Sequence, residues 1–304
     1  MKKDELREEL IGIPCIIDCH THSGGLDLHN FLNQSYPSAQ NLPDLALKEK
    51  LAGVGYFITF AMPSTFYSLD ASLESFPYEK ANKCLLFESS FTKGAIPFLS
   101  IWPGEEEQKQ LSFAKEVMSE GRLFGFKLHS VATKTKISDL EGSVFIDFLE
   151  KNNLPIIIHT DNHNESANPN LVLDLAEKHG KIRISAAHVG YFDSHFLEEV
   201  GRFPNVFFDV SPLSRLFAKS TRGQIKINPA LNYDSPSKLL ESIVGMHPDK
   251  ALWGTDEPWT SLIGKGEVIL RSDPTSEVKI LESLPASDKM KLSYVNPLKF
   301  IFGE

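Results

Sequence analysis

Short apolar runs rich in β-branched residues recur along the whole chain, and stretches with helical spacing lie between them. Continuous apolar runs are typical of buried parallel strands, and apolar positions three or four residues apart are typical of helices that cover a sheet. The predicted strands are 13–19, 55–62, 96–102, 123–128, 155–158, 182–187, 206–210 and 251–254. The predicted helices between them include 43–51, 108–119, 144–151, 170–179, 196–200 and 237–244.

The alternation of strands and helices predicts the fold class. Parallel strands need helical crossovers, so eight repeats favour an α/β fold, a closed (β/α)₈ TIM barrel, with residues 1–304 as one domain. An open doubly wound sheet is the alternative, but no GxGxxG turn follows the first strand. The segments 23–41 and 212–234 are predicted to be long and irregular, as loops that cover a site often are.

Composition narrows the class of partner. The hydrophobic and charged fractions, 41% and 23%, are those of an ordinary globular protein. A net charge of −9 argues against nucleic-acid binding, which depends on cations that neutralise phosphates. No signal peptide, long apolar run or CxxC pair is found. We therefore expect a cytoplasmic protein with a small-molecule substrate and no nucleic-acid or membrane partner; a homodimer is compatible with this composition.

The first predicted strand ends in the motif DCHTH, residues 18–22. Side chains two residues apart share a face of a strand, so Asp18, His20 and His22 are expected to point into the barrel. Ile17 and Cys19 should then face the helices. Two imidazoles would converge at the carboxyl end of the strand, where barrel enzymes gather their catalytic groups.

Three later strands also end in a potential metal ligand. His159 ends IIIHT, His188 follows SAA, and Asp256 ends LWGTD. A lone histidine at such a position is usually an ordinary core or rim residue. Four strand ends that all carry histidine or aspartate instead predict a catalytic metal site, which needs a few imidazole and carboxylate ligands and one open position for water.

The ordered set IIDCHTH, IIIHTD, SAAHVG and LWGTDEPW resembles the amidohydrolase superfamily, in particular its amidohydrolase-related (amidohydrolase 2) subgroup of metal-dependent hydrolases and decarboxylases. The ending NPLKFIF resembles the last helix of that subgroup. The resemblance extends from about residue 13 to residue 302. It implies that His20, His22 and His159 are metal ligands and that Asp256 is a ligand or the general base. It also implies that His188 contacts the substrate or a second metal.

The fourth predicted strand reads GFKLH and adds Lys127 and His129 as candidate substrate-binding residues. In some relatives a lysine here is carboxylated and bridges two metals, and in others it is an ordinary cation. We favour one divalent ion, Zn²⁺, over a second ion held through Lys127 and His188. The structural alternative for Lys127 is an internal ion pair with Asp18 or Asp209. A lysine at this position also argues against nucleases of the TatD type, which carry a carboxylate there.

Other polar and aromatic residues are weaker candidates. Asp18 and Asp209 are expected to hydrogen-bond and orient ligand imidazoles, or else to make purely structural hydrogen bonds. A cationic cluster could meet an anionic substrate or be scattered surface charge: Arg215, Lys219 and Arg222. Aromatic residues could form an apolar substrate wall or only pack the loops: Phe31, Tyr36, Trp102, Tyr191 and Trp259.

The leading functional hypothesis is a hydrolase of a small amide, ester or lactone. A metal-activated water would attack a carbonyl carbon, Asp256 would accept the proton, and His188 would stabilise the oxyanion. The first alternative is a non-oxidative decarboxylase of a small aromatic or enoic acid, which would use Lys127 or Arg215 to hold the acid. A catalytically silent metal-binding barrel is the second, and the complete set of ligands argues against it.

Overall fold

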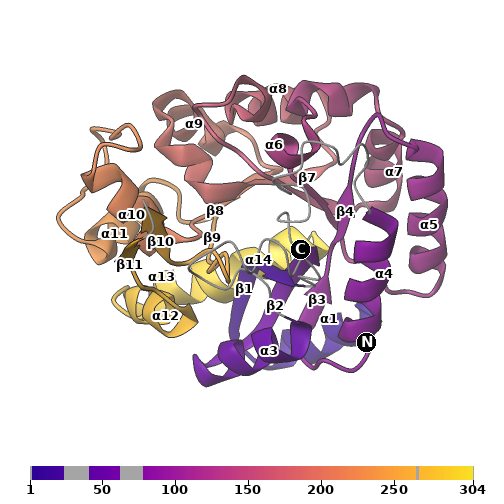
Figure 1. Cartoon of the computed structure of the whole chain (residues 1–304), viewed down its shortest axis with the longest axis horizontal. Coiled ribbons are helices and arrows are strands. Elements are labelled where there is room, and N and C mark those ends of the chain that lie inside the picture. Colours follow the sequence, from indigo (N-terminus) through magenta and orange to yellow (C-terminus); the bar gives the residue numbers. More distant parts are fainter. Residues whose placement is uncertain (1, 24–40, 62–77, 265–266, 304) are drawn as a thin grey trace.

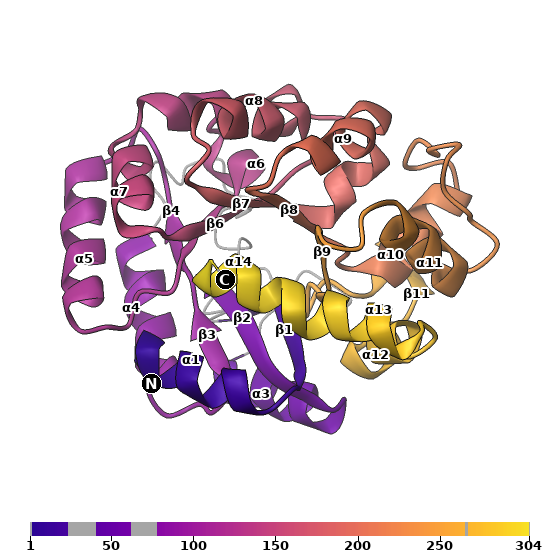
Figure 2. The ribbon, with the colours of Figure 1, turned by 180° about the vertical axis from the view of Figure 1, so that it is seen from behind.

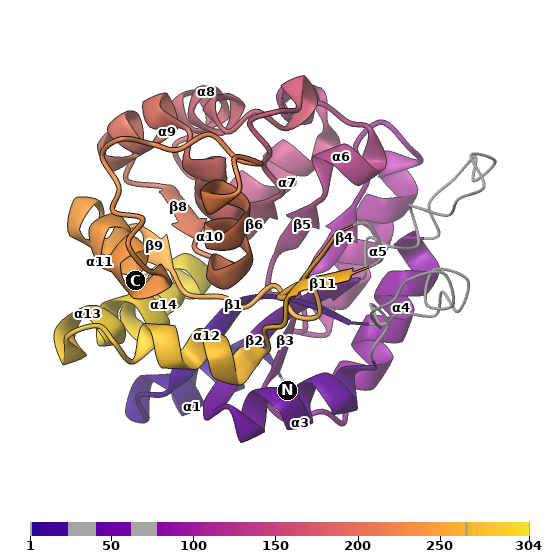
Figure 3. The same ribbon diagram turned by 60° about the vertical axis from the view of Figure 1, so that its left-hand side comes forward.

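The computed structural model describes residues 2–23, 41–61, 78–264 and 267–303. Within these residues, parallel strands form a barrel and helices surround it (Figures 1 and 3). The (β/α)₈ fold is therefore confirmed. The barrel segments are β1 (Ile16–Ser23), β2 (Val54–Ala61), β3 (Ala95–Pro97), β4 (Leu99–Ile101), β5 (Phe126–Leu128), β6 (Pro155–Ile158), β7 (Arg183–Ala186), β8 (Val206–Asp209) and β9 (Ala251–Leu252).

The third strand of the barrel is divided at Phe98 into β3 and β4. The Phe98 N–H donates to Thr59 O of β2 at 2.9 Å, whereas the Leu99 N–H donates to Gly125 O, next to β5, at 3.0 Å. The nine segments thus form eight strands. Residue 125 must be glycine because a Cβ there would lie 2.4 Å from the Phe98 ring, which packs across it.

The barrel closes between its last and first strands. Cys19 N donates to Trp253 O at 2.9 Å, and His22 N donates to Glu257 O at 2.8 Å. A parallel bridge joins Thr21 to Glu257. The residues that end β1 and those that follow β9 are therefore held side by side.

The longer helices follow the strands around the outside of the barrel, and none of those described is long and apolar enough to cross a membrane. They are α3 (Leu42–Leu51), α4 (Tyr78–Ser89), α5 (Glu107–Ser119), α7 (Val144–Asn152), α8 (Asn170–Lys178), α9 (Ser194–Glu199), α10 (Leu213–Thr221), α11 (Pro236–Met246), α12 (Pro274–Leu281) and α13 (Ala286–Met290). Shorter additions are α6 (Ser130–Thr133) and the hairpin of β10 (Leu262–Gly264) and β11 (Glu267–Leu270).

Alternate residues of the barrel strands serve separate apolar clusters. Ile156 and Ile158 of β6 pack in the cluster that includes the helix residues, whereas Ile157 belongs to the cluster inside the barrel. Two helices, α1 (Lys3–Gly12) and α14 (Asn296–Phe302), close the far end of the barrel, where α14 crosses it in Figure 2. The inner cluster therefore fills the barrel below the strand ends, and polar chemistry is confined to the mouth.

The predicted strands lie at the predicted places, with ends that differ by a few residues. The expectation that 212–234 is irregular is wrong for its first part, which α10 occupies, whereas residues 222–234 form no helix or strand. This helix buries Leu213, Leu216 and Ser220 on one face. Of the other long segment, 23–41, residues 24–40 lie outside the part of the chain that the structure describes.

A buried carboxylate joins α12 to the first turn of α10. Glu277 is 1% exposed and accepts hydrogen bonds from Ser214 N and Ser272 Oγ, both at 3.2 Å. Burial raises the pKa of Glu277 to about 7, although these hydrogen bonds oppose the shift. The folded protein therefore keeps a proton that the unfolded chain releases at lower pH.

We predict that Glu277 makes the folded state less stable as the pH rises from about 4.5 to about 7. Over this window the folded chain holds the proton and the unfolded chain has lost it, at a cost on the order of 3 kcal/mol. Urea denaturation at a series of pH values should show a flatter profile for Glu277→Gln than for the wild type. Glu282→Gln, an exposed change near the end of the same helix, is the control. Identical profiles for Glu277→Gln and wild type would contradict the assignment.

Candidate metal centre and active site

A β-bulge in β1 sets the directions of the side chains in the DCHTH motif. Asp18 pairs with Phe57 of β2, but the next pair is Thr21 with Thr59, so β1 contains one extra residue. Cys19, like Ile17, packs in the cluster inside the barrel. The expectation that Ile17 and Cys19 face the helices is therefore wrong, because a strict alternation of faces does not survive an inserted residue.

Asp18 binds main-chain groups. Its buried carboxylate accepts hydrogen bonds from the N–H groups of His20 at 2.8 Å and Thr255 at 3.1 Å. Burial raises its pKa well above the usual range. Among the residues described, it makes no contact with a ligand imidazole, so its hydrogen bonds correspond to the structural one of the two roles suggested from the sequence. It instead fixes the bulge against the segment that follows β9.

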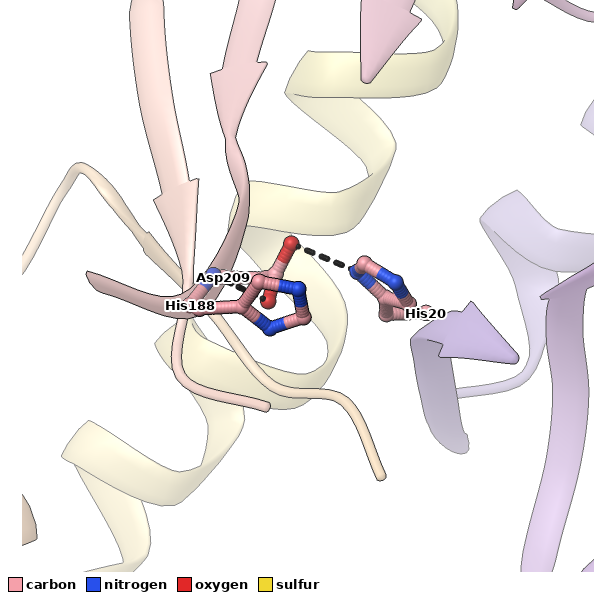
Figure 4. A group of neighbouring side chains, drawn as sticks. All are labelled: His20, His188 and Asp209. Atoms are coloured by element: carbon pink, nitrogen blue, oxygen red, sulfur yellow. Dashed lines mark hydrogen bonds and ion pairs between the residues drawn. The ribbon is translucent and has the colours of Figure 1, made fainter. Parts of the chain in front are cut away.

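The imidazole of His20 is oriented by Asp209, which ends β8. His20 Nδ1 lies 2.9 Å from Asp209 Oδ2, and dashed lines in Figure 4 join the two oxygens of Asp209 to the His20 ring and to the main chain of His188. A carboxylate can only accept, so Nδ1 carries the proton and His20 Nε2 keeps its lone pair. The other oxygen of Asp209 accepts from His188 N at 3.1 Å. Asp209 is one of the two aspartates that the sequence suggested for this orienting role.

The side chains of His22 and Asp256 converge on His20 Nε2, so three potential ligands meet at this point. Asp256 Oδ1 lies 3.4 Å from this nitrogen and 3.1 Å from His22 Nε2, and the potential ligand atoms of the three residues are all within 4.8 Å of one another. Burial lowers the pKa of His20 to about 3 and also lowers that of His22, so both rings are neutral near pH 7. Burial would raise the pKa of Asp256, but the hydrogen bond with His22 and neighbouring histidines hold it below its usual range.

This donor set fits a divalent cation. The unprotonated His20 Nε2 and the Asp256 carboxylate are both electron-pair donors, so a positive charge between them is favourable. A nitrogen and oxygen set of this kind suits zinc and other first-row divalent ions. A second cluster of potential ligands consists of His20, His188 and Asp209. Both carboxylate oxygens of Asp209 are already used in hydrogen bonds to His20 and His188.

Lys127 brings a positive charge close to the same point. Its Nζ lies 3.5 Å from His20 Nε2 and 4.5 Å from the centre of the Phe60 ring. Burial lowers its pKa to about 8, and the charges of Asp209 and Asp256 limit the shift. No salt bridge joins Lys127 to Asp18 or Asp209 within the described ranges, so the suggested internal ion pair does not form.

His159 contacts His188, whose ring centroid lies 5.0 Å from that of His20. Its Nδ1 is 3.1 Å from His188 Nε2, and its ring stacks on His129 with centroids 4.0 Å apart. His188 Nδ1 lies 2.7 Å from the carbonyl oxygen of Ser211, which can only accept. With Nδ1 of His188 donating to this oxygen and Nε2 accepting from His159 Nδ1, His159 Nε2 keeps a lone pair.

His188 lies in an unusual left-handed turn. The φ angles of residues 188–192 are 64°, 55°, 57°, 51° and 59°, although only residue 190 is glycine. Such a conformation costs about 1–2 kcal/mol for each non-glycine residue. Hydrogen bonds from His188 N to Asp209 and from Asn162 Nδ2 to Tyr191 O hold the turn. The strain is thus located where the His188 ring is presented.

These groups open into a pocket of about 190 Å³. The sequence-based candidates His129, Arg215, Tyr191 and Trp259 line it, and Lys127 lies in a small adjoining cavity with His22 and His129. The full lining is His22, His129, His159, His188, Tyr191, Pro212, Arg215, Leu216, Lys219, Asp256 and Trp259.

Other predicted site residues do not line this pocket. Trp102 lies at a separate hollow beside α5, and Arg222 is exposed beyond the end of α10. Phe31 and Tyr36 lie outside the described residues. Pro212 and Leu216 were missed because α10 was not predicted. The spacing of Leu213 and Leu216 within 212–222 is the signal that could have revealed it.

The chain matches the family model described as Amidohydrolase (Amidohydro_2) over residues 17–302, a range that contains every converging histidine and aspartate above. No curated protein matches the chain. The 5-carboxyvanillate decarboxylase of Sphingomonas paucimobilis is 11% identical, with a TM-score of 0.65 over 95% of this chain and 99% of that one.

Two further solved structures are similar over 95% of this chain and 99% of theirs. A 2,6-dihydroxybenzoate decarboxylase complexed with 2,6-dihydroxybenzoate is 10% identical, with a TM-score of 0.63. A probable 2-pyrone-4,6-dicarboxylic acid hydrolase of Acinetobacter baumannii, with citric acid bound, is 13% identical, with a TM-score of 0.60. At these identities the likeness shows a shared fold.

We predict that Asp209→Asn weakens divalent-metal binding by about 10- to 100-fold, because the neutral amide orients and polarises the His20 ring less well. Competition with a chelator of known affinity, followed by metal analysis, measures the change. Asp147→Asn, at an exposed position of α7, is the matched control. A folded Asp209→Asn protein with wild-type metal affinity would refute the orienting role.

Proposed function

Because the chain belongs to the amidohydrolase family, we propose that it is a metal-dependent hydrolase that cleaves an amide, ester or lactone bond in a small molecule. The observation that carries the proposal is the convergence of His20 Nε2, His22 Nε2 and Asp256 Oδ1 beside the pocket. A closed apolar core below and a small pocket above leave one face of this cluster open to a substrate.

We propose that His20, His22, His159 and Asp256 hold one divalent cation, with zinc as the first choice. The lone pair on His159 Nε2 supports its inclusion, since His188 orients this ring as Asp209 orients His20. When bound, such an ion would activate water and polarise a substrate oxygen. A second ion held through Lys127 and His188 is the alternative.

The proposed chemistry assigns separate tasks to the residues around the pocket. Both imidazole contacts of Asp256 use Oδ1, so Oδ2 is the atom proposed to take the proton from water. His129 lines the pocket and is proposed to contact the substrate oxygen that gains negative charge, whereas His188, whose two ring nitrogens contact Ser211 O and His159, is proposed to position the His159 ring. Lys127, buried beside His20, would add positive charge to the same region.

Decarboxylation of a small carboxylic acid is the second candidate. The buried Lys127 ammonium 3.5 Å from His20 Nε2, together with Arg215 in the pocket, would hold a reacting carboxylate. Two structural neighbours are named as a 5-carboxyvanillate decarboxylase and a 2,6-dihydroxybenzoate decarboxylase, and others are named as a hydrolase and a hydratase.

We predict that the zinc-loaded protein turns over at least one member of a panel of lactones, amides, esters and aromatic carboxylates. Acid release in H₂¹⁸O, with label in the product, identifies hydrolysis, and CO₂ release identifies decarboxylation. Asp256→Asn should lower the rate by about 10²-fold or more, as expected when a proton acceptor is lost. CO₂ release without label incorporation would replace the hydrolase with the decarboxylase. Turnover by Asp256→Asn at the wild-type rate would refute the role of Asp256.

Metal analysis tests the proposed ligands directly. We predict one ion per chain in the wild type and substantially less in His159→Ala after dialysis against a chelator. His163→Ala is the control, because His163 is near in sequence but absent from the pocket lining. Full metal content in a folded His159→Ala protein would remove His159 from the ligand set, and two ions per chain would favour the Lys127 alternative.

A further inference from the structure

Two cations of α10 line the same pocket as the converging histidines and Asp256. Arg215 and Lys219 are four residues apart, so they project from one face of the helix, with Cβ atoms roughly 5–6 Å apart. Like charges at this spacing repel each other and destabilise an isolated helix. Because both cations line one partly enclosed pocket, a negative charge bound between them would be stabilising.

Neither cation forms a salt bridge in the part of the chain that the structure describes, although the charges of Asp161 and Asp256 act on Lys219 from a greater distance. Arg215 donates from Nη1 to the carbonyl oxygen of Trp259 at 2.9 Å, and Lys219 Nζ lies 5.6 Å from the centre of the Tyr191 ring. Within the described ranges, neither side chain has a carboxylate at salt-bridge distance. Burial and the nearby Arg215 lower the pKa of Lys219 to about 8, so it still carries its proton near pH 7.

Both cations are fixed relative to the candidate catalytic residues. Trp259 accepts the Arg215 hydrogen bond at its carbonyl oxygen, and its main-chain N–H donates to Asp256 O at 2.6 Å. Tyr191, under Lys219, belongs to the left-handed turn that presents His188. A ligand bound by the two cations would therefore sit at a set position with respect to Asp256 and His188.

The ligand class follows from the groups around the pair. The first turn of α10 is capped by the Glu277 carboxylate, which accepts from Ser214 N, so this helix end does not supply a phosphate site. The positive charge comes from one planar guanidinium and one ammonium, which suit a carboxylate. Pro212, Leu216 and Trp259 add carbon surface for an apolar body.

We propose that Arg215 and Lys219 together bind a carboxylate of the substrate that is not the reacting group. The inference rests on the proposed function, because it takes this pocket to be the substrate site. The substrate is then a small molecule with two polar ends: a carboxylate held by α10 and a scissile group beside Asp256. Hydrolysis is compatible with such a molecule, and decarboxylation is compatible with it when Lys127 rather than Arg215 holds the reacting carboxylate.

Calorimetric titration of the zinc-loaded protein tests this without turnover. The probes are benzoate, isophthalate and glutarate, their amides, and inorganic phosphate. We expect at least one carboxylate to bind and its amide to bind about 10-fold more weakly or worse. Arg215→Met and Lys219→Met should each weaken binding of the carboxylate by a similar factor. Lys219→Arg should restore most of the affinity, and Lys115→Met, which removes the same charge from an exposed site on α5, should match the wild type.

Several results would overturn the proposal. The proposal is wrong if the carboxylate and its amide bind equally well, or if Lys219→Met binds the carboxylate with wild-type affinity. It is also wrong if no carboxylate shows saturable binding, or if phosphate binds to Arg215 and Lys219 more tightly than any carboxylate. These results are independent of the function test. A protein that hydrolyses neutral and carboxylated esters equally well keeps the proposed function and loses this inference. A protein inert on the activity panel but with the expected binding pattern loses the function and keeps the carboxylate site.

Discussion

The buried hydrogen bond between Asp209 and the His20 imidazole is the contact around which the candidate site is organised. Asp209 is fully buried, and an isolated carboxylate there would be costly unless both oxygens were satisfied. One oxygen accepts from His20, and the other accepts from His188 N and from the N–H and hydroxyl of Ser211. The residue thereby ties the ends of three strands together and fixes which nitrogen of His20 is available as a ligand.

A second buried carboxylate holds His20 from the main-chain side. Asp18 accepts from the N–H groups of His20 and Thr255, which stabilises the bulge against the segment after β9. Gly254 permits this close approach, since a Cβ there would lie 3.0 Å from His20 Cβ. The ring and the backbone of one histidine are thus positioned by two different aspartates, only one of which touches the imidazole.

The pocket combines a rigid part with a part contributed by a helix. The histidines and Asp256 are attached to barrel strands or to the turns directly after them, where the sheet fixes their geometry. Arg215 and Lys219 come from α10, which is joined to the rest of the site through Trp259 and through Glu277. The barrel therefore supplies the proposed chemistry, and α10 is the natural element to select the substrate.

The sequence alone determined the (β/α)₈ fold and placed the chemical residues at strand ends, because continuous apolar runs and helical spacing are local properties that survive folding. It also identified His20, His22, His159, His188 and Asp256 as one set, and the structure places all of them in or beside one pocket. It failed where a single residue changes the geometry. The extra residue in β1 turned Asp18 to main-chain groups and Cys19 to the inner core. Only tertiary structure decided that Lys127 stands beside His20 and that His188 orients His159. Those outcomes depend on contacts between residues far apart in sequence, which no local pattern encodes.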